Sequence, residues 1–127
     1  MFRYCSDIKE IDLSHFDSSR VTNMNSMFSS CSKLTYLDPS QLDTSNVQSM
    51  NSMFSGCYRL ISLDLSKLDT SKVTSMNNMF SSCSSLTYLD PSKLNTSNVQ
   101  SMNSMFSNCN KLNSINLNIL LLLQLKI

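Results

Sequence analysis

The sequence predicts an α/β solenoid of about five rungs, with a short parallel sheet on one face and short helical turns on the other. Two observations carry this prediction. The pair Met-Phe returns every 26 residues without insertion, and a cysteine follows three residues after each Phe. Each repeat also holds apolar residues in the spacing L-x-x-L-x-L. A fixed period of 20 to 50 residues is typical of stacked units that bury their apolar faces against each other.

The repeat 53–78 shows why a strand and a helical turn are expected. Residues 63–65 read Leu-Asp-Leu, and this alternation of period two predicts a short, half-buried strand. From Val73 to Cys83 the apolar residues follow helical spacing, which predicts a helix or helical turn. Stacking would then place the strands about 4.8 Å apart in a parallel sheet.

The register of the repeats sets the domain organisation. We divide the chain into a solenoid over 1–118 and an apolar C-terminal tail over 119–127. The solenoid comprises repeats 1–26, 27–52, 53–78 and 79–104 and a partial repeat 105–118. The tail is far shorter than the ~20 residues that cross a bilayer, so it is interpreted as a cap over the last rung or as an out-of-register end.

The sequence also has a longer period of two repeats, in addition to the 26-residue period. Pro39 and Pro91 stand at a strand position that holds Leu65 in the intervening repeat. Proline has no backbone donor, so the strand should end near these residues. Segments 27–52 and 79–104 are nearly identical, which indicates duplication of a 52-residue pair.

Composition and motifs limit the function. The formal net charge is +1, which gives no general electrostatic case for nucleic acid. The sequence contains no G-x-S-x-G, Walker or H-E-x-x-H motif, so neither an enzyme nor a cofactor is expected. No leader precedes the Met1-Phe2 pair, which already stands in register. Either the chain is a fragment of a longer protein or its first rung is open at its outer side.

The phrase LDLSKLDTSKVTSMNNMFSSCSSL (63–86) and its copies resemble the BspA-like leucine-rich repeat in its 26-residue surface-protein form. The resemblance covers residues 1 to about 118. It implies a leucine-rich-repeat coil that is secreted or displayed at a cell surface. Its partner would be an extracellular or host-surface protein or a glycan, bound in adhesion.

Two columns of sulfur-containing residues are interpreted as core. The cysteines stand at one position of every repeat, where free thiols act as small buried apolar groups. Disulfides between adjacent rungs are the geometric alternative. The methionines fall almost wholly in two columns at helical spacing and are interpreted as core filler.

Asp12, Asp38, Asp64 and Asp90 form a column that should point to solvent. Like charges about 5 Å apart repel by roughly 0.8 kcal/mol per pair in water, so the column needs an offset. Hydrogen bonds from the serine two residues later supply one. A bound calcium ion at these four residues is the weaker alternative, because carboxylates are hard ligands.

A second acidic column, Asp17, Asp43 and Asp69, becomes Asn95 in the fourth repeat. Both Asp and Asn cap turns, so this column is interpreted as structural.

Tyr36 and Tyr88 stand two residues before an aspartate of the first column, on the same predicted face. Exposed aromatics on a rigid surface are binding anchors in many interfaces, although strands also simply tolerate tyrosine. The predicted ligand-binding residues are Tyr36, Asp38, Ser62, Asp64, Tyr88 and Asp90.

The expected function is non-catalytic binding of a protein or glycan. One alternative is a structural solenoid that self-associates into homo-oligomers through open ends. A weaker alternative is an ice- or mineral-binding array built on the column Ser18, Thr44, Thr70 and Thr96.

Overall fold

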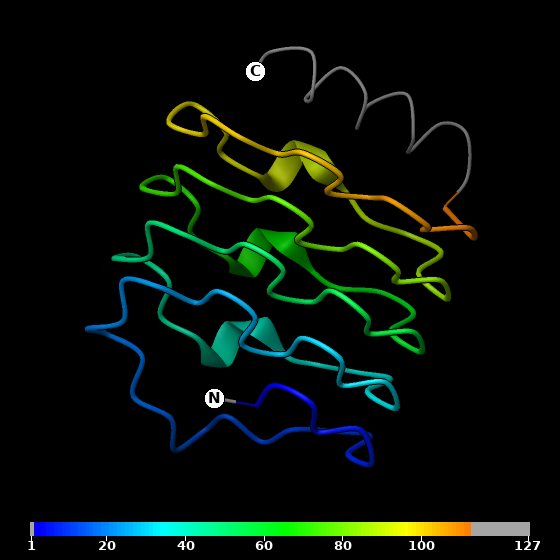
Figure 1. Ribbon diagram of the computed structural model, residues 1–127. Helices are drawn as coiled ribbons and strands as arrows, with labels where there is room; N and C mark the ends of the chain where they lie inside the picture. The colour runs from blue at the N-terminus through cyan, green and yellow to red at the C-terminus, as the bar shows by residue number, and fades with distance from the viewer. Residues whose placement is uncertain (1, 113–127) are drawn as a thin grey trace.

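The protein is a stack of similar turns of chain. The computed structural model describes residues 2–112, and in Figure 1 these turns lie one above another from the blue first turn to the orange last one. Backbone hydrogen bonds join successive turns at the same position, as in Met24 N to Ser49 O (2.9 Å) and Met50 N to Ser75 O (3.0 Å). We call each 26-residue turn of the stack a rung.

Regular secondary structure is scarce in the described residues. It consists of three 3-10 helices, η1 (Pro39–Gln41), η2 (Leu65–Lys67) and η3 (Pro91–Lys93), which lie above one another in Figure 1. Parallel pairing is limited to isolated bridges, such as Ser62 with Tyr88. The predicted α/β class, with a parallel sheet on one face and helical turns on the other, is therefore wrong.

The predicted sheet fails because the aspartate column ends the extended segment. Asp64 is extended (φ −81°, ψ 96°), but it is also the N-cap of η2, and its side chain accepts a hydrogen bond from Ser66 N. The chain therefore turns into a 3-10 helix at Leu65, where the prediction continued the strand. Too few extended residues remain in each rung to form a ladder.

The predicted helical turns fail because the backbone reverses its handedness within them. Asn78 and Ser82 have φ of 55° and 62°, in the left-handed region. The N–H groups alternate in direction as a result. That of Met79 bonds to Met76 O three residues back (3.3 Å), whereas that of Phe80 bonds to Met105 O in the next rung (2.9 Å).

One of these left-handed positions holds the single glycine of the chain. Gly56 has φ +76°, and a Cβ built there would lie 3.3 Å from Ser30 Oγ. The equivalent residues Ser30, Ser82 and Asn108 adopt φ of 61°, 62° and 61° with their side chains in place. The stack therefore imposes this conformation even where glycine is absent.

The core consists of columns that run along the stack. The Phe rings lie nearly parallel on one another, with centroids 5.5 Å apart for Phe28 and Phe54 and 5.4 Å apart for Phe54 and Phe80. Leucines and methionines of the same rungs are buried around them. The cysteines are free thiols, as the core interpretation requires, and Cys57 Sγ donates to Phe28 O at 3.2 Å.

Polar side chains close the gaps between rungs. Asn51 Oδ1 accepts from Asn77 N (2.8 Å) and Ser75 Oγ (2.6 Å), and the same pattern recurs one rung below. Ser18, Thr44 and Thr70 are only 3%, 2% and 1% exposed and bond to the backbone of the next rung. The predicted tail 119–127 lies outside the described residues.

Candidate binding face

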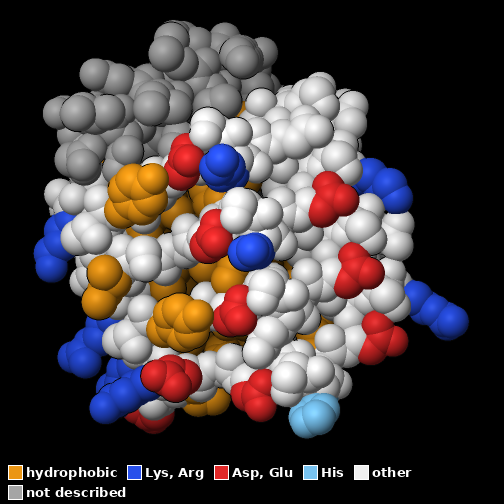
Figure 2. Space-filling model, turned by 180° about the vertical axis from the view of Figure 1, so that it is seen from behind, with side chains coloured by type: hydrophobic (Ala, Val, Ile, Leu, Met, Phe, Trp, Pro, Cys, Tyr) orange, Lys and Arg blue, Asp and Glu red, His pale blue; other side chains and the backbone are white. Residues whose placement is uncertain are grey.

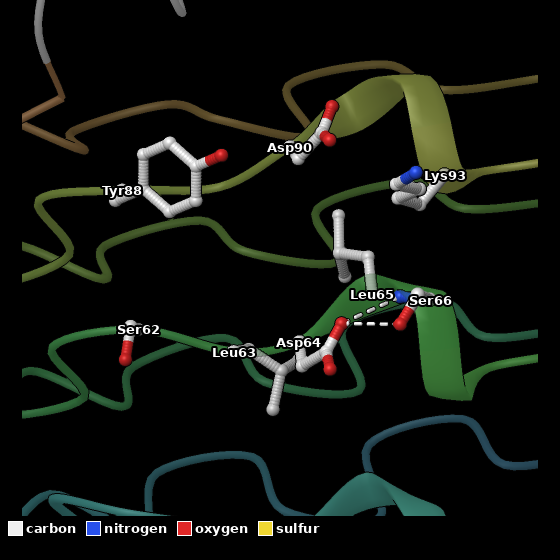
Figure 3. A pocket seen from close by; sticks show the side chains of 8 residues that line it. All are labelled: Ser62, Leu63, Asp64, Leu65, Ser66, Tyr88, Asp90 and Lys93. Carbon is white, nitrogen blue, oxygen red and sulfur yellow. Dashed lines mark hydrogen bonds between the residues drawn. The ribbon is translucent and has the colours of Figure 1, made fainter.

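The six predicted ligand-binding residues line two adjoining hollows on one face of the stack. The lower hollow is lined by Tyr36, Asp38, Ser62 and Asp64, together with Lys67 and neighbouring apolar residues. The upper hollow is lined by Ser62, Asp64, Tyr88 and Asp90, together with Lys93 (Figure 3). Ser62 and Asp64 belong to both hollows. We call this surface, with the exposed Ile61 beside it, the tyrosine face.

Exposed apolar side chains run up one side of the face. Tyr36, Ile61 and Tyr88 are 59%, 53% and 57% exposed, whereas the neighbouring Leu37, Leu63 and Leu89 are buried. Figure 2 shows hydrophobic side chains in a column beside a column of acidic and basic ones. Sequence reasoning missed Ile61. Its only signal was an apolar residue at the position that holds Thr35 and Thr87.

The aspartates of the face are held by the serines that follow them. Asp64 Oδ1 accepts from Ser66 N (3.0 Å) and Ser66 Oγ (2.6 Å), and Asp38 and Asp90 make the same pair of bonds with Ser40 and Ser92. The serine hydroxyl bond is the largest influence that lowers the pKa of each of these three carboxyls. All three are therefore charged at neutral pH.

Two lysines stand among these aspartates. Lys67 also lowers the pKa of Asp38 and Asp64, and Lys93 also lowers the pKa of Asp64 and Asp90. The lysines thus add to the serine hydrogen bonds in offsetting the repulsion within the column. Sequence reasoning missed their role, because Gln41 and His15 occupy the same position in other rungs.

The calcium alternative gains no support from this geometry. Across residues 2–112, no three His, Cys, Asp or Glu side chains come close enough together to hold a metal ion. Asp12, Asp38, Asp64 and Asp90 each take hydrogen bonds within their own rung instead.

The second acidic column has a structural role. Asp43 Oδ1 accepts from Ser45 N (3.0 Å) and Ser45 Oγ (2.6 Å). Asn95 Oδ1 makes the equivalent bonds to Ser97 N (3.1 Å) and Oγ (2.7 Å). Because an amide replaces the carboxylate without loss of a contact, the cap needs the oxygen and not the charge.

A third hollow adjoins the tyrosine face and has a basic lining. It is formed by Thr35, Arg59, Ile61, Ser85, Thr87 and Lys111. Sequence reasoning missed this basic column. Its signal was the recurrence of Lys33, Arg59 and Lys111 at one repeat position.

Comparison with known proteins places the chain in a family but does not give it a function. None of the described helices has the length and apolar character that a membrane span requires. No curated protein and no solved structure matches the sequence significantly. A family model covers residues 1–119, which is nearly the whole chain. The chain therefore belongs to the family described as Mycoplasma protein of unknown function, DUF285.

Proposed function

We propose that the chain is a non-catalytic binding module whose tyrosine face takes a protein or glycan at a cell surface. The observation that carries the proposal is the position of Tyr36 and Tyr88. Both rings are more than half exposed, and each borders a hollow that also contains carboxylates. Large aromatic side chains beside polar groups are typical anchors of binding interfaces.

The cell-surface setting rests on the resemblance to BspA-like leucine-rich repeats. Such proteins are surface-displayed or secreted and bind host proteins or other cells. A repeated scaffold with a few exposed aromatics suits that use, because the backbone that carries them is held by bonds between rungs and loses little freedom when the ligand arrives.

The test is a binding screen against extracellular-matrix proteins and a glycan array, followed by substitution of the tyrosines. Tyr36→Ser and Tyr88→Ser should each weaken binding at least about tenfold, because both remove a proposed anchor. Tyr58→Ser is the matched control, since Tyr58 is 51% exposed and lines neither hollow. Equal affinity of all three variants and the unchanged chain would refute the proposal.

Self-association is a second candidate, favoured by the first rung. Phe2, Phe16 and Val21 are only partly buried, whereas their equivalents in the second rung belong to the closed core. A further rung stacked on this end would cover them, and in the self-association candidate that rung belongs to a second copy. Light scattering across a range of concentrations tests this: a constant monomer mass rules it out, and Val21→Asp should abolish any growth in mass.

The column proposed for ice or mineral binding gives that alternative little support. The hydroxyls of Ser18, Thr44 and Thr70 are buried and bonded to backbone, and Thr96 is half-buried.

A further inference from the structure

The two tyrosines of the face lie two rungs apart, and this spacing restricts the shape of a ligand. The repeat position of Tyr36 and Tyr88 holds Ser62 in the rung between them. Chains paired as in a parallel bridge lie about 4.8 Å apart, so the backbone positions of the two tyrosines are about 10 Å apart along the stack. The core agrees, since the Phe28–Phe54 and Phe54–Phe80 centroid distances are 5.5 and 5.4 Å.

Few polypeptide conformations present equivalent side chains at this interval. In an extended strand, side chains on one face recur at about 6.7 Å, which fits neither one rung nor two. A polyproline II helix has three residues per turn and rises about 3.1 Å per residue, so every third residue returns at about 9 Å. That distance matches the two tyrosines.

In an α-helix, side chains seven residues apart lie on one face at about 10.5 Å, which is also near this distance. The residues of the middle rung nevertheless do not suit a helix. Its residues three or four along would fall on the middle rung and require an apolar groove there. Between the tyrosines the middle rung offers Ser62 and Asp64, which are polar and exposed. Its exposed apolar Ile61 lines the adjoining basic hollow and neither of the two hollows that the tyrosines border. In a polyproline II segment the two intervening residues point away, so nothing apolar must meet Ser62.

The charges of the face favour a basic residue beside the prolines. Asp38, Asp64 and Asp90 each engage Oδ1 with a serine, and within residues 2–112 no hydrogen bond or ion pair occupies Oδ2. Lys67 and Lys93 contribute two positive charges against these three negative ones, so the column keeps an excess of negative charge. A guanidinium group can pair with a carboxylate that has a free oxygen.

We propose that the tyrosine face binds a proline-rich segment in the polyproline II conformation that runs along the stack. One proline packs on Tyr36, the proline three residues away packs on Tyr88, and a flanking Arg pairs with an aspartate of the column. Aromatic-lined grooves recognise such segments because the ligand is already extended and loses little entropy on binding. This inference rests on the proposed binding function and gives it a ligand class.

Fluorescence polarisation with labelled peptides of about twelve residues, carrying three prolines spaced at every third position and one terminal Arg, tests the inference. The unchanged chain should bind this peptide and should lose at least about tenfold in affinity for a peptide of the same composition with proline at every fourth position. Replacing the Arg of the every-third peptide by Glu should weaken its binding to the unchanged chain. Asp64→Asn in the protein should weaken binding of the Arg peptide, and this variant keeps the bonds to Ser66 because an amide oxygen also accepts.

Tyr36→Ser and Tyr88→Ser should each reduce peptide affinity, and Tyr58→Ser should not. Circular dichroism and the melting temperature establish that each variant is folded. If no proline-rich peptide binds, or if both proline spacings bind equally, the inference is wrong. If a matrix protein or glycan binds through Tyr36 and Tyr88 while the peptides do not, the proline-rich ligand class is wrong and the proposed binding function stands. If no ligand depends on the tyrosines, both the ligand class and the proposed binding function are wrong.

Discussion

The hydroxyl of Thr44 serves both backbone groups of Asp69 in the next rung. Thr44 Oγ1 accepts from Asp69 N at 2.8 Å and donates to Asp69 O at 3.0 Å. Thr70 and Asn95 repeat the arrangement one rung above. A side chain of this kind replaces the backbone ladder that two flat strands would have formed, so it should contribute directly to stability.

Thr44→Val should therefore be destabilising although it preserves shape. The substitution leaves the N–H and C=O of Asp69 without their partner in a part-buried place beside the buried Thr44, which costs about 1–3 kcal/mol. Thr44→Ser keeps the hydroxyl and should cost clearly less. Urea unfolding of both variants measures the difference, and a valine variant as stable as the unchanged chain would contradict the role assigned to the hydroxyl.

Asn95 tests whether the second acidic column needs charge. Asn95→Asp should change the free energy of unfolding little at neutral pH, because the carboxylate accepts the same two bonds from Ser97. Asn95→Ala removes both bonds and should cost about 1 kcal/mol. Thermal unfolding of the two variants provides the measurement. A large loss in the Asp variant would show that the amide itself is required.

Acid should weaken the fold. The serine hydroxyls lower the pKa of Asp38 and Asp64 in the folded state from the ordinary value of 3.8. A group with a depressed folded pKa contributes its stability in full above the unfolded pKa and loses it as the pH falls through the folded pKa. The melting temperature should thus be steady near neutral pH and fall below about pH 4. The combined variant Asp38→Asn, Asp64→Asn and Asp90→Asn should show a flatter decline.

The cysteines should differ sharply in reactivity. Burial raises the pKa of Cys57 to about 12 and that of Cys109 to about 11, and it also raises the pKa of Cys31 and Cys83. A protonated, enclosed thiol does not react readily with a thiol reagent. Cys5 is only partly buried, so it alone should react quickly in the native protein.

Ellman's reagent measures this difference directly. The native protein should show one fast thiol, and Cys5→Ser should remove it. Unfolding in guanidinium without reductant should then expose all five cysteines of the chain as free thiols. Fewer than four free thiols under those conditions would contradict the core column.

Sequence periodicity predicted which residues share a column but not how the backbone connects them. The Leu, Met, Phe and Cys columns are buried, because a repeated apolar position can be buried only against its own copies. The predictions of a strand and a helical turn were wrong, because the capping of the 3-10 helix depends on Asp64 and the left-handed φ falls on Asn78 and Ser82. Asp, Asn and Ser are also common in ordinary loops, so they gave no distinct signal. Only Gly56 indicated that the backbone turns left-handed.

Only some residues of the tyrosine face could be predicted from the sequence, because recurrence in the repeats was the only available signal. Tyr36 and Asp38 stood out because they recur with Tyr88 and Asp90 in the near-identical repeat. Lys67 and Ile61 did not, because the position of Lys67 holds His15 and Gln41 in the first two rungs and that of Ile61 holds threonine in the rungs on either side. Their importance depends on which neighbours the stack brings beside them.

The alternating N–H groups give the stack a direction. Along the segment of Met24, Phe28 and Ser30, every backbone–backbone bond between rungs runs from an N–H in the earlier rung to a carbonyl in the later one, at 2.9, 2.9 and 2.7 Å. Outside this segment the direction is reversed, as in the bond from Thr35 N to Lys9 O (3.0 Å). Two copies meeting through their first rungs would therefore set like groups of this segment against each other. In the self-association proposed above, this segment therefore favours head-to-tail stacking, and a head-to-tail contact without closure produces an open polar fibre instead of a symmetric dimer.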